Sequence, residues 1–229
     1  MSHFTCAVIH RKDQDIEEML APYDESLQVE PYVVYTRQQA IDYARENYDS
    51  CKNASDEECW KYMAEDYDSD AEGNLLSRYN RNSAWDWWTV GGRWSGMLKT
   101  KRGSADSARI GDIDFSLDQA AFNGALRFWD VIVEGKPQNP GENFFSIYKP
   151  EYYREFYGDR ETYARHQAQF STYAVVTPDG VYHSKGKMGW WAMSSETSEE
   201  ARRWEDSYME RFIENADRNL ILTIVDLHI

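Results

Sequence analysis

Acidic and histidine side chains near the chain ends could do acid–base or metal chemistry. Residues 220–229 are predicted to form a strand. Asp226 and His228 are two positions apart in it, so their side chains should point to the same face. His3 lies at the start of another predicted strand, and the ends of small domains often lie close together. A carboxylate–imidazole cluster of this kind can bind a divalent metal or act as general acid and base. The alternative is that Asp226 only orients His228 or caps a turn.

A second pair of carboxylates lies in the middle of the chain. Asp112 and Asp114 form an Asp-x-Asp pair in the polar connector 106–115. With Asp226 and His228, they are the candidate ligands of a metal-dependent hydrolase. A catalytic thiol is not expected, because Cys6 lies in an apolar strand, where a thiol is buried and inert. The glycines of the chain lack the spacing of a nucleotide-cofactor fingerprint, and no cofactor is predicted.

The densest group of binding side chains is SAWDWWTVGGRWSG, residues 83–96, which holds four of the nine tryptophans around a Gly-Gly-Arg. Aromatic rings can stack on a base, and an arginine offers a planar fork of donors suited to phosphate or carboxylate. The predicted ligand-binding residues are Trp85, Trp87, Trp88, Arg93, Trp94, Trp190 and Trp191. The other interpretation is that the tryptophans fill the core and that Arg93 pairs with Asp86 or another acid.

Gly91 and Gly92 also predict local structure. Two glycines between strand-forming runs are typical of a two-residue hairpin turn, since both can take a positive φ. Alternation along the first arm would place Trp85 and Trp87 on one face and Trp88 on the other. Both faces would then carry tryptophan, so the face away from the core should be covered by a helix, a partner or a ligand.

The remaining elements follow from hydrophobic periodicity and capping signals. Strands are predicted at 4–10, 32–35 and 220–229, and a hairpin at 172–184. Helices are predicted at 13–23, 36–48, 55–67, 116–134, 150–169 with an interruption near Gly158, and from 197 onward. Four capping boxes mark helix starts: Thr36 with Gln39, Ser55 with Glu58, Ser116 with Gln119, and Thr197 with Glu200. Without an internal repeat or a low-complexity linker, this mixture predicts a single α+β domain over residues 1–229 with a largely antiparallel sheet.

The charge of the chain narrows its possible partners. A net charge of −15 repels nucleic-acid phosphates and anionic membranes, so direct binding to either is not expected. Residues 54–73 alone hold eight acids and one lysine, which would suit a basic protein surface. No apolar run approaches the ~18 residues of a membrane span, and the N-terminus lacks the features of a signal peptide. A cytoplasmic location is therefore predicted.

Six short stretches together resemble an uncharacterised family of hypothetical proteins from phages and mobile elements. They are the start MSHFT, the middle stretches WDWW and GGRW, GDIDF, the late MGWW and the ending VDLHI. The family commonly ends in Val-Asp-Cys-His-Ile, whereas this chain has Leu227 in place of the cysteine, which argues against a thiol function there. The resemblance implies a phage-like accessory protein in a host cell cytoplasm. Many such proteins counter host defences, either by sequestering a nucleotide signal or by blocking an effector protein.

Three functions follow from these features. The first is non-enzymatic binding of a nucleotide-derived small molecule in a pocket of tryptophans and Arg93. The second is an acidic inhibitor that docks on the basic surface of a nucleic-acid-handling host defence protein. The third is a metal-dependent hydrolase that uses Asp112, Asp114, Asp226 and His228. The first is preferred, because the aromatic and arginine side chains are concentrated in one stretch.

Overall fold

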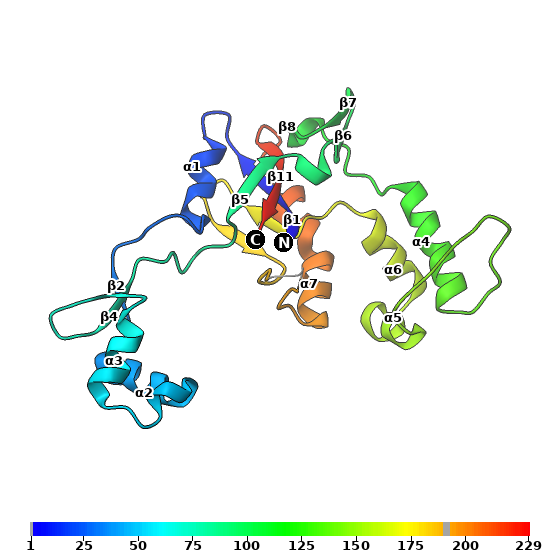
Figure 1. Cartoon of the computed structure of the whole chain (residues 1–229). Helices are drawn as coiled ribbons and strands as arrows, with labels where there is room; N and C mark the ends of the chain where they lie inside the picture. The colour runs from blue at the N-terminus through cyan, green and yellow to red at the C-terminus, as the bar shows by residue number, and fades with distance from the viewer. Residues whose placement is uncertain (1, 190–192) are drawn as a thin grey trace. The chain divides into compact units, whose positions relative to one another are not determined.

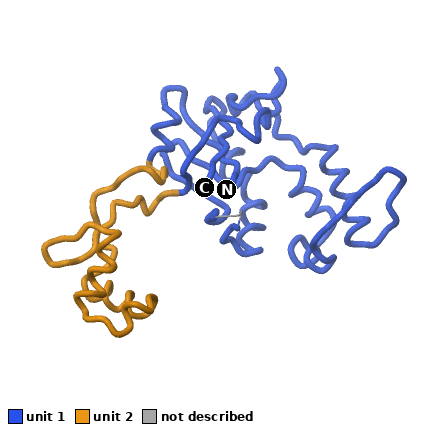
Figure 2. Tube along the Cα trace, viewed as in Figure 1, with its two compact units in different colours: residues 1–21, 84–229 blue, residues 22–83 orange. Residues whose placement is uncertain are grey.

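The computed structural model describes residues 2–189 and 193–229. The fold is α+β with mostly antiparallel strands, which confirms the predicted fold class. The chain divides into two compact units, unit 1 (Met1–Ala21 and Ala84–Ile229) and unit 2 (Pro22–Ser83) (Figure 2). Unit 2, inserted between the two segments of unit 1, has its own sheet and its own buried core. The expectation of one domain over residues 1–229 stays a prediction.

Unit 1 is built on a six-stranded sheet with the order β10-β9-β1-β11-β5, in which β8 also pairs with β11 (Figure 1). These strands are β1 (His3–His10), β5 (Trp87–Val90), β8 (Ser107–Arg109), β9 (Ala174–Val176), β10 (Tyr182–Ser184) and β11 (Ile221–His228). β1 and β9 run parallel, and the other pairs are antiparallel. β6 (Leu98–Thr100) and β7 (Gly103–Ala105) form a separate antiparallel pair.

The two chain ends form the centre of this sheet. β1 and β11 pair along their whole length, from His3 opposite His228 to His10 opposite Ile221. Beyond the strands, the N–H of Ser2 donates to the carbonyl of Ile229 at 2.9 Å, and the ends lie side by side (Figure 1). Both strands are long apolar runs that pack on two faces, so they could be predicted from sequence. The expectation that the chain ends meet is confirmed.

One face of β1 and β11 packs against α7 (Ser198–Met209) and the turn that continues it. Ala7, Ile9, Leu222 and Ile224 of the strands form one buried cluster with Trp204, Tyr208 and Phe212. Because side chains alternate along a strand, the same face continues toward the chain ends with His3, Asp226 and His228. The sheet face therefore changes from apolar to polar at the end where His3, Asp226 and His228 lie, and this end is the candidate functional site.

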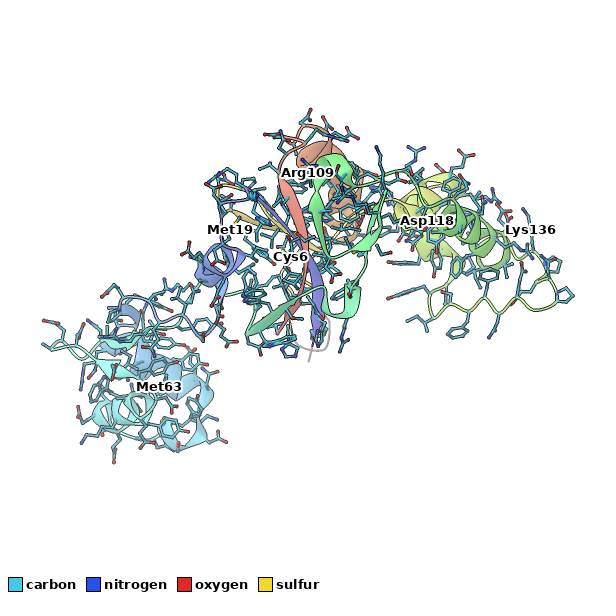
Figure 3. All side chains as sticks on the ribbon, turned by 90° about the horizontal axis from the view of Figure 1, so that it is seen from above. Cys6, Met19, Met63, Arg109, Asp118 and Lys136 are labelled. Carbon is cyan, nitrogen blue, oxygen red and sulfur yellow. The ribbon has the colours of Figure 1, made fainter. Side chains whose placement is uncertain are left out.

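Cys6 belongs to the interior of the central strand (Figure 3). Its side chain is completely buried, and this burial raises the pKa of the thiol. Since the thiolate is the reactive form, the cysteine is inert at neutral pH. The prediction that Cys6 is a buried core residue is confirmed.

Three helices of unit 1 form a small bundle: α4 (Gln119–Ile132), α5 (Pro150–Tyr157) and α6 (Arg160–Ala168). Gly158, with a φ of 77°, breaks the predicted helix 150–169 into α5 and α6, as expected. The predicted capping box of Ser116 and Gln119 is wrong. The helix starts at Gln119, and the Asp118 side chain accepts the N–H groups of Ala120 and Ala121 instead. An aspartate directly before the first helical residue is a better N-cap than a serine two residues earlier.

The loop after α4 is closed by Glu142. Its carboxylate accepts two hydrogen bonds from Arg127 at 2.8 and 2.7 Å, and one from the N–H of Asn139 at 2.7 Å. Arg127, and then Asn139, lower the pKa of this carboxyl from 4.5 to about 2. A lowered pKa in the folded state stabilises the fold above the ordinary pKa, and the contribution is lost as the pH falls toward the lowered value.

We therefore expect Glu142→Gln to reduce stability at neutral pH and to flatten the acid limb of the stability curve between pH 4.5 and 2. Urea unfolding at a series of pH values measures both effects. The matched control is Glu134→Gln, an acid near the same loop whose recorded ion pair is to Lys136 alone. Parallel acid limbs for Glu142→Gln and the unsubstituted protein would contradict this account of the loop.

The stretch 83–96 does not form the predicted hairpin. Both glycines have positive φ, 71° and 51°, but Gly92–Trp94 form a 3-10 turn instead of a second strand. β5 pairs with β11, so Trp87 lies opposite His228 and Trp88 opposite Leu227. The turn is held by long-range bonds, because the N–H of Gly91 donates to Ile224 and that of Arg93 to Asp226. The glycines were correct signals of a turn, but the partner strand lies far along the chain.

Unit 2 consists of β2 (Tyr32–Tyr35), α2 (Arg37–Asn47), α3 (Asp56–Ala64), β3 (Asp68–Ser69) and β4 (Leu75–Ser77). Its core contains Ala40, Ile41, Cys51, Cys59 and Met63, and Figure 3 shows Met63 among the side chains of the helices. The capping boxes at Thr36 and Ser55 are confirmed, as is the one at Thr197 in unit 1. In the part of the chain that the structure describes, none of the helices has the length and apolar character needed to cross a membrane.

Candidate functional site

The imidazole of His3 is held by a buried carboxylate. Its Nδ1 lies 2.8 Å from Oδ1 of Asp226, whose side chain is only 3% exposed. An ionised carboxylate can only accept a hydrogen bond, so Nδ1 is the donor. With Nδ1 as the donor, Nε2 is an acceptor and a base in the neutral ring and a second donor in the protonated ring. β1 and β11 position the pair, because Asp226 lies opposite Thr5, one diagonal step from His3.

The second imidazole, that of His228, is held in the same way. Its Nδ1 lies 2.6 Å from Oδ1 of Asp86, and the N–H of Asp86 donates to the carbonyl of His228 at 3.0 Å. Asp86 stands immediately before β5, so this backbone bond continues the pairing of β5 with β11. The alternative interpretation of the sequence paired Asp86 with Arg93; in the structure its side chain binds His228 instead.

The two imidazoles meet beside an exposed indole. The rings of His3 and His228 have centroids 4.9 Å apart in an edge arrangement, and the ring of Trp87 lies 6.4 Å from that of His3. Trp87 is 51% exposed, whereas the two imidazoles are mostly covered, with 16% and 15% of their side chains exposed. Within the residues that the structure describes, neither Nε2 has a hydrogen-bond partner. We call this group of His3, Asp86, Trp87, Asp226 and His228 the imidazole site.

Asp226 links the imidazole site to the glycine turn. While Oδ1 binds His3, Oδ2 accepts the N–H of Arg93 at 3.0 Å. A Cβ on Gly92 would lie 2.4 Å from Cβ of Asp226, which explains a glycine at that position. The two hydrogen bonds satisfy a charge that would otherwise be costly to bury. The turn therefore fixes the carboxylate that orients His3, and it places Arg93, an exposed residue, next to the site.

The stretches that carry the sequence resemblance largely meet here. Their contributions are His3 from the start, Asp86 and Trp87 from WDWW, Arg93 from GGRW, and Asp226 and His228 from the ending. Gly189, the second residue of MGWW, also lies at this end of the sheet, because the hydroxyl of Ser2 donates to its carbonyl at 2.9 Å. Segments up to 223 residues apart in the chain thus form a single polar site.

The predicted tryptophans are dispersed in the structure. Trp85 is completely buried, with its ring 5.6 Å from that of Tyr182, so it belongs to the core. Trp88 is half-buried on β5, and Trp94 packs against the cluster under α7. Trp190 and Trp191 lie outside the described residues. Of the predicted aromatic group, Trp87 joins the imidazole site, with Arg93 at the neighbouring turn.

The candidate metal ligands do not form one set. Asp112 pairs with Arg109 at 3.0 Å, and the Asp114 carboxylate accepts the N–H of Ser116 at 3.0 Å. Asp226 and His228 are engaged with His3 and Asp86 instead. Across the described residues, no group of three or more His, Cys, Asp or Glu side chains is arranged to hold a metal ion. The prediction that the ends of the chain form a carboxylate–imidazole cluster holds without Asp112 and Asp114.

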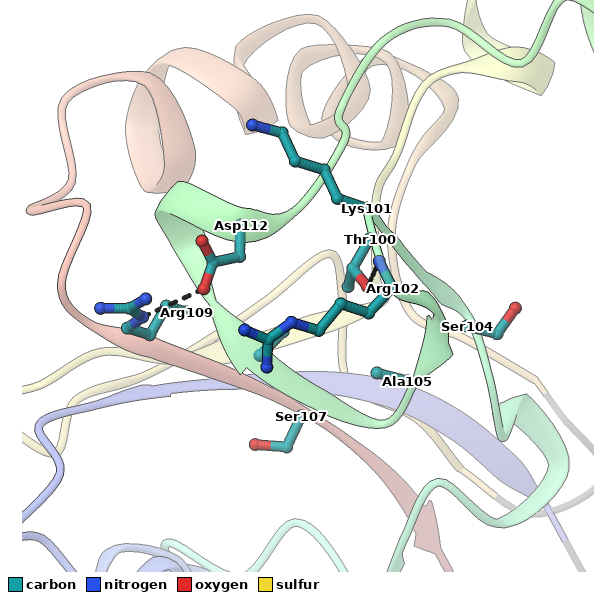
Figure 4. A pocket seen from close by; sticks show the side chains of 9 residues that line it. Thr100, Lys101, Arg102, Ser104, Ala105, Ser107, Arg109 and Asp112 are labelled. Carbon is teal, nitrogen blue, oxygen red and sulfur yellow. Dashed lines mark hydrogen bonds and ion pairs between the residues drawn. The ribbon is translucent and has the colours of Figure 1, made fainter.

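Asp112 instead lines a basic pocket of about 380 Å³ at β6, β7 and β8. Its charged side chains are Lys101, Arg102, Arg109 and Asp112. Figure 4 shows the Arg102 side chain extending across the pocket, while Lys101 extends away from it. Because Asp112 neutralises Arg109, Arg102 is the cation that remains for an anionic ligand in this pocket.

Sequence reasoning found His3, Asp226 and His228 but missed Asp86 as the second orienting carboxylate. The strand period placed Asp226 and His228 on one face, which is local information. The pairing of Asp86 with His228 depends on β5 adding to β11, across 142 positions of the chain, and no local pattern encodes it. Comparisons with protein families, curated proteins and solved structures give no match to this chain. The function must therefore be argued from the geometry of unit 1.

Proposed function

We propose that unit 1 binds an anionic, nucleotide-like small molecule at the imidazole site, with Arg93 beside it, and that it does so without transforming the ligand. The observation that carries the proposal is the exposed indole of Trp87 next to two imidazoles that are each oriented by a carboxylate. A surface tryptophan has little reason to stand beside two pre-oriented polar rings in a purely structural role. A base on the indole and a phosphate on the imidazoles would use both features.

The chemistry of each group fits that ligand. Stacking of a base on an aromatic side chain is worth about 1–3 kcal/mol. Protonated imidazoles donate through Nε2 to phosphate oxygens, and Arg93 adds a fork of donors that matches phosphate geometry. Two imidazolium rings would balance the charges of Asp86 and Asp226, and Arg93 would then make the site locally positive for a bound anion on an acidic protein. The resemblance to phage proteins supplies the proposed role, the sequestration of a nucleotide signal of host defence.

The proposal predicts that Arg93→Ala weakens binding of a nucleotide probe at least tenfold, because a charged hydrogen bond to phosphate is worth about 1.5–3 kcal/mol. Arg93→Lys should also weaken it, since a point charge cannot replace the planar fork. Calorimetric titration with ADP-ribose and with cyclic dinucleotides measures both effects. The melting temperature should stay unchanged, because the Arg93 side chain is exposed and has no recorded ion pair with a described residue.

Arg102→Ala is the matched control. It removes the free cation of the basic pocket and leaves the imidazole site intact. If Arg102→Ala abolishes binding while Arg93→Ala and Trp87→Ala do not, the ligand binds in the basic pocket and the proposal is wrong. Lost stability in Arg93→Ala without any measurable nucleotide affinity in the unsubstituted protein would also overturn it.

Hydrolysis of a phosphodiester is the second candidate, and one observation favours it. Two imidazoles with centroids 4.9 Å apart, each with a carboxylate on Nδ1, can act as an acid–base pair. One Nε2 would take a proton from water, while the other, protonated, would give one to the leaving oxygen. Incubation of the protein with bis(4-nitrophenyl) phosphate and with cyclic dinucleotides tests this. Product formation that both His3→Gln and His228→Gln abolish would establish an enzyme in place of a binding protein.

A further inference from the structure

A group of tyrosines in unit 2 surrounds a pocket of about 200 Å³. The five rings come from β2, α2, α3 and the segments that follow the two helices, and Met63 lies among them. They are Tyr35, Tyr43, Tyr48, Tyr62 and Tyr67, which we call the tyrosine cage. Unit 2 as a whole carries half of the sixteen tyrosines of the chain, in 62 residues. Such a concentration around one pocket calls for a physical reason.

The rings of the tyrosine cage touch in series. Centroid distances are 6.2 Å from Tyr67 to Tyr35, 5.3 Å from Tyr35 to Tyr43, 6.3 Å from Tyr43 to Tyr48 and 4.8 Å from Tyr48 to Tyr62. None of these contacts is a parallel stack, because the interplanar angles range from 39° to 85°. Rings inclined to each other in this way cannot stack flat on one another, so they line the pocket from different directions.

The cage is open to solvent, unlike an ordinary aromatic core. Tyr43 is 38% exposed and Tyr62 is 42% exposed, while the core of unit 2 lies below them around Cys59 and Met63. Among the described residues, the five phenol hydroxyls make no hydrogen bond to the protein. Tyrosines that served only to fill the interior would be buried, with their hydroxyls satisfied.

The rim of the cage is negatively charged. Glu65 and Asp66 line the pocket, and within the described chain neither carboxylate has an ion pair. The cationic side chains of the neighbouring helices are engaged elsewhere: Arg37 with Glu57, Arg45 with Asp56, Lys52 with Asp49, and Lys61 with Glu57. These four cations are therefore engaged away from the cage, and Arg78 lines the adjoining pocket with Glu65 and Asp66 instead of the cage itself.

The pKa shifts of two cage tyrosines are consistent with the negative charge at the rim. Burial, and after it the neighbouring tyrosines and Asp66, raise the pKa of Tyr48. Burial, then Tyr35 and Asp66, raise the pKa of Tyr67. The phenols of Tyr48 and Tyr67 therefore remain neutral at physiological pH. The face of a phenol ring carries the negative side of its quadrupole, which attracts a cation. A surround of aromatic faces with a carboxylate at the rim suits a bulky, weakly hydrated cation better than a small, strongly hydrated one.

We propose that the tyrosine cage binds an alkylated ammonium group, of the kind carried by a trimethylated lysine side chain or by choline. Such a group is charged and apolar at once, so it gains from ring faces on several sides and loses little hydration on entry. Glu65 and Asp66 add attraction from the rim. The site consists of residues of unit 2 alone and does not depend on the function proposed for unit 1.

The test is an NMR titration of the full chain with choline, with a trimethyllysine peptide and with the same peptide carrying unmodified lysine. Choline and the trimethylated peptide should shift the ring signals of the cage, and the unmodified peptide should bind more weakly. Whichever of choline and the trimethyllysine peptide binds more tightly identifies the kind of molecule that carries the alkylated ammonium group. The neutral isostere 3,3-dimethylbutan-1-ol has the shape of choline without its charge, and it should not bind.

Variants locate the binding. Tyr62→Leu and Asp66→Asn should each weaken choline binding roughly two- to fivefold, as expected for a cation–π or rim contact at an exposed site. Tyr79→Leu is the matched control, because Tyr79 is also an exposed tyrosine of unit 2 but does not line the pocket. Asp66→Asn changes one exposed atom, so it tests the site even if Tyr62→Leu impairs folding. No shift at tens of millimolar choline, equal binding of the neutral isostere, or equal loss in Tyr79→Leu would overturn the proposal.

Discussion

Replacing Gly92 by alanine should destabilise unit 1 by about 2–5 kcal/mol, as the sum of two costs. The first is the positive φ of 51°, which an L residue with a Cβ adopts at a cost of about 1–2 kcal/mol. The second is steric, because the new Cβ would lie 2.4 Å from Cβ and 2.5 Å from Oδ2 of Asp226. Overpacking of a fitted site costs about 1–3 kcal/mol. Urea unfolding followed by circular dichroism measures the sum.

Gly135→Ala separates the two costs. Gly135 has a φ of 70°, but a Cβ there would meet nothing within 4 Å. It should therefore show the backbone cost alone. Gly92→Ala should also displace the Asp226 carboxylate and with it His3, so nucleotide affinity should fall in this variant only. Equal destabilisation in the two variants would mean that the turn does not fix Asp226.

Trp85→Ala should have the largest effect on stability of any substitution in the WDWW stretch. Its side chain is completely buried, and truncating a buried tryptophan costs about 3–5 kcal/mol. Trp87→Ala, two residues further on, should change stability by less than about 0.5 kcal/mol, because half of that side chain is in solvent. Nucleotide binding should show the opposite order, with affinity lost in Trp87→Ala. Thermal unfolding and titration of the same two proteins measure both orders.

A similar loss of stability in the two variants would show that Trp87 is part of the core, and the proposed stacking role would have no basis. The two residues are a sharp comparison because they have the same chemistry and lie only two positions apart. They differ only in what surrounds them. Trp85 contacts Tyr182 in the interior, and Trp87 lies beside His3 at the surface.

Local signals account for the parts of the fold that could be predicted from sequence. The capping boxes at Thr36, Ser55 and Thr197 involve residues three apart, and all three form. β1 and β11 could be predicted because each is a run of mostly apolar residues, and the structure buries most of both runs. The break at Gly158 and the turn before Gly180 follow from backbone preferences of glycine. Each of these is decided within a few residues of the chain.

Long-range pairing accounts for what could not be predicted. Gly91 and Gly92 take positive φ as expected, but β5 finds its partner in β11, so the expected hairpin is replaced by a 3-10 turn. The boundaries of unit 2 have no low-complexity linker, and an insertion of this kind leaves no composition signal. The tyrosine cage could not be predicted from sequence either. Its rings are spread over 33 positions and come together only when α2 and α3 pack.

Binding of a nucleotide-like anion at the imidazole site can be measured directly through the five histidines of the chain. The Cε1–H proton of each imidazole gives a separate NMR signal, assigned by single His→Gln variants. In a titration with ADP-ribose and with cyclic dinucleotides, the signals of His3 and His228 should move together. Those of His10 and His166, which are buried elsewhere, and of His183 beside Phe212, should stay in place. If the signals of His3 and His228 stay fixed with every nucleotide while another region responds, or if no signal moves at all, the proposed site is wrong.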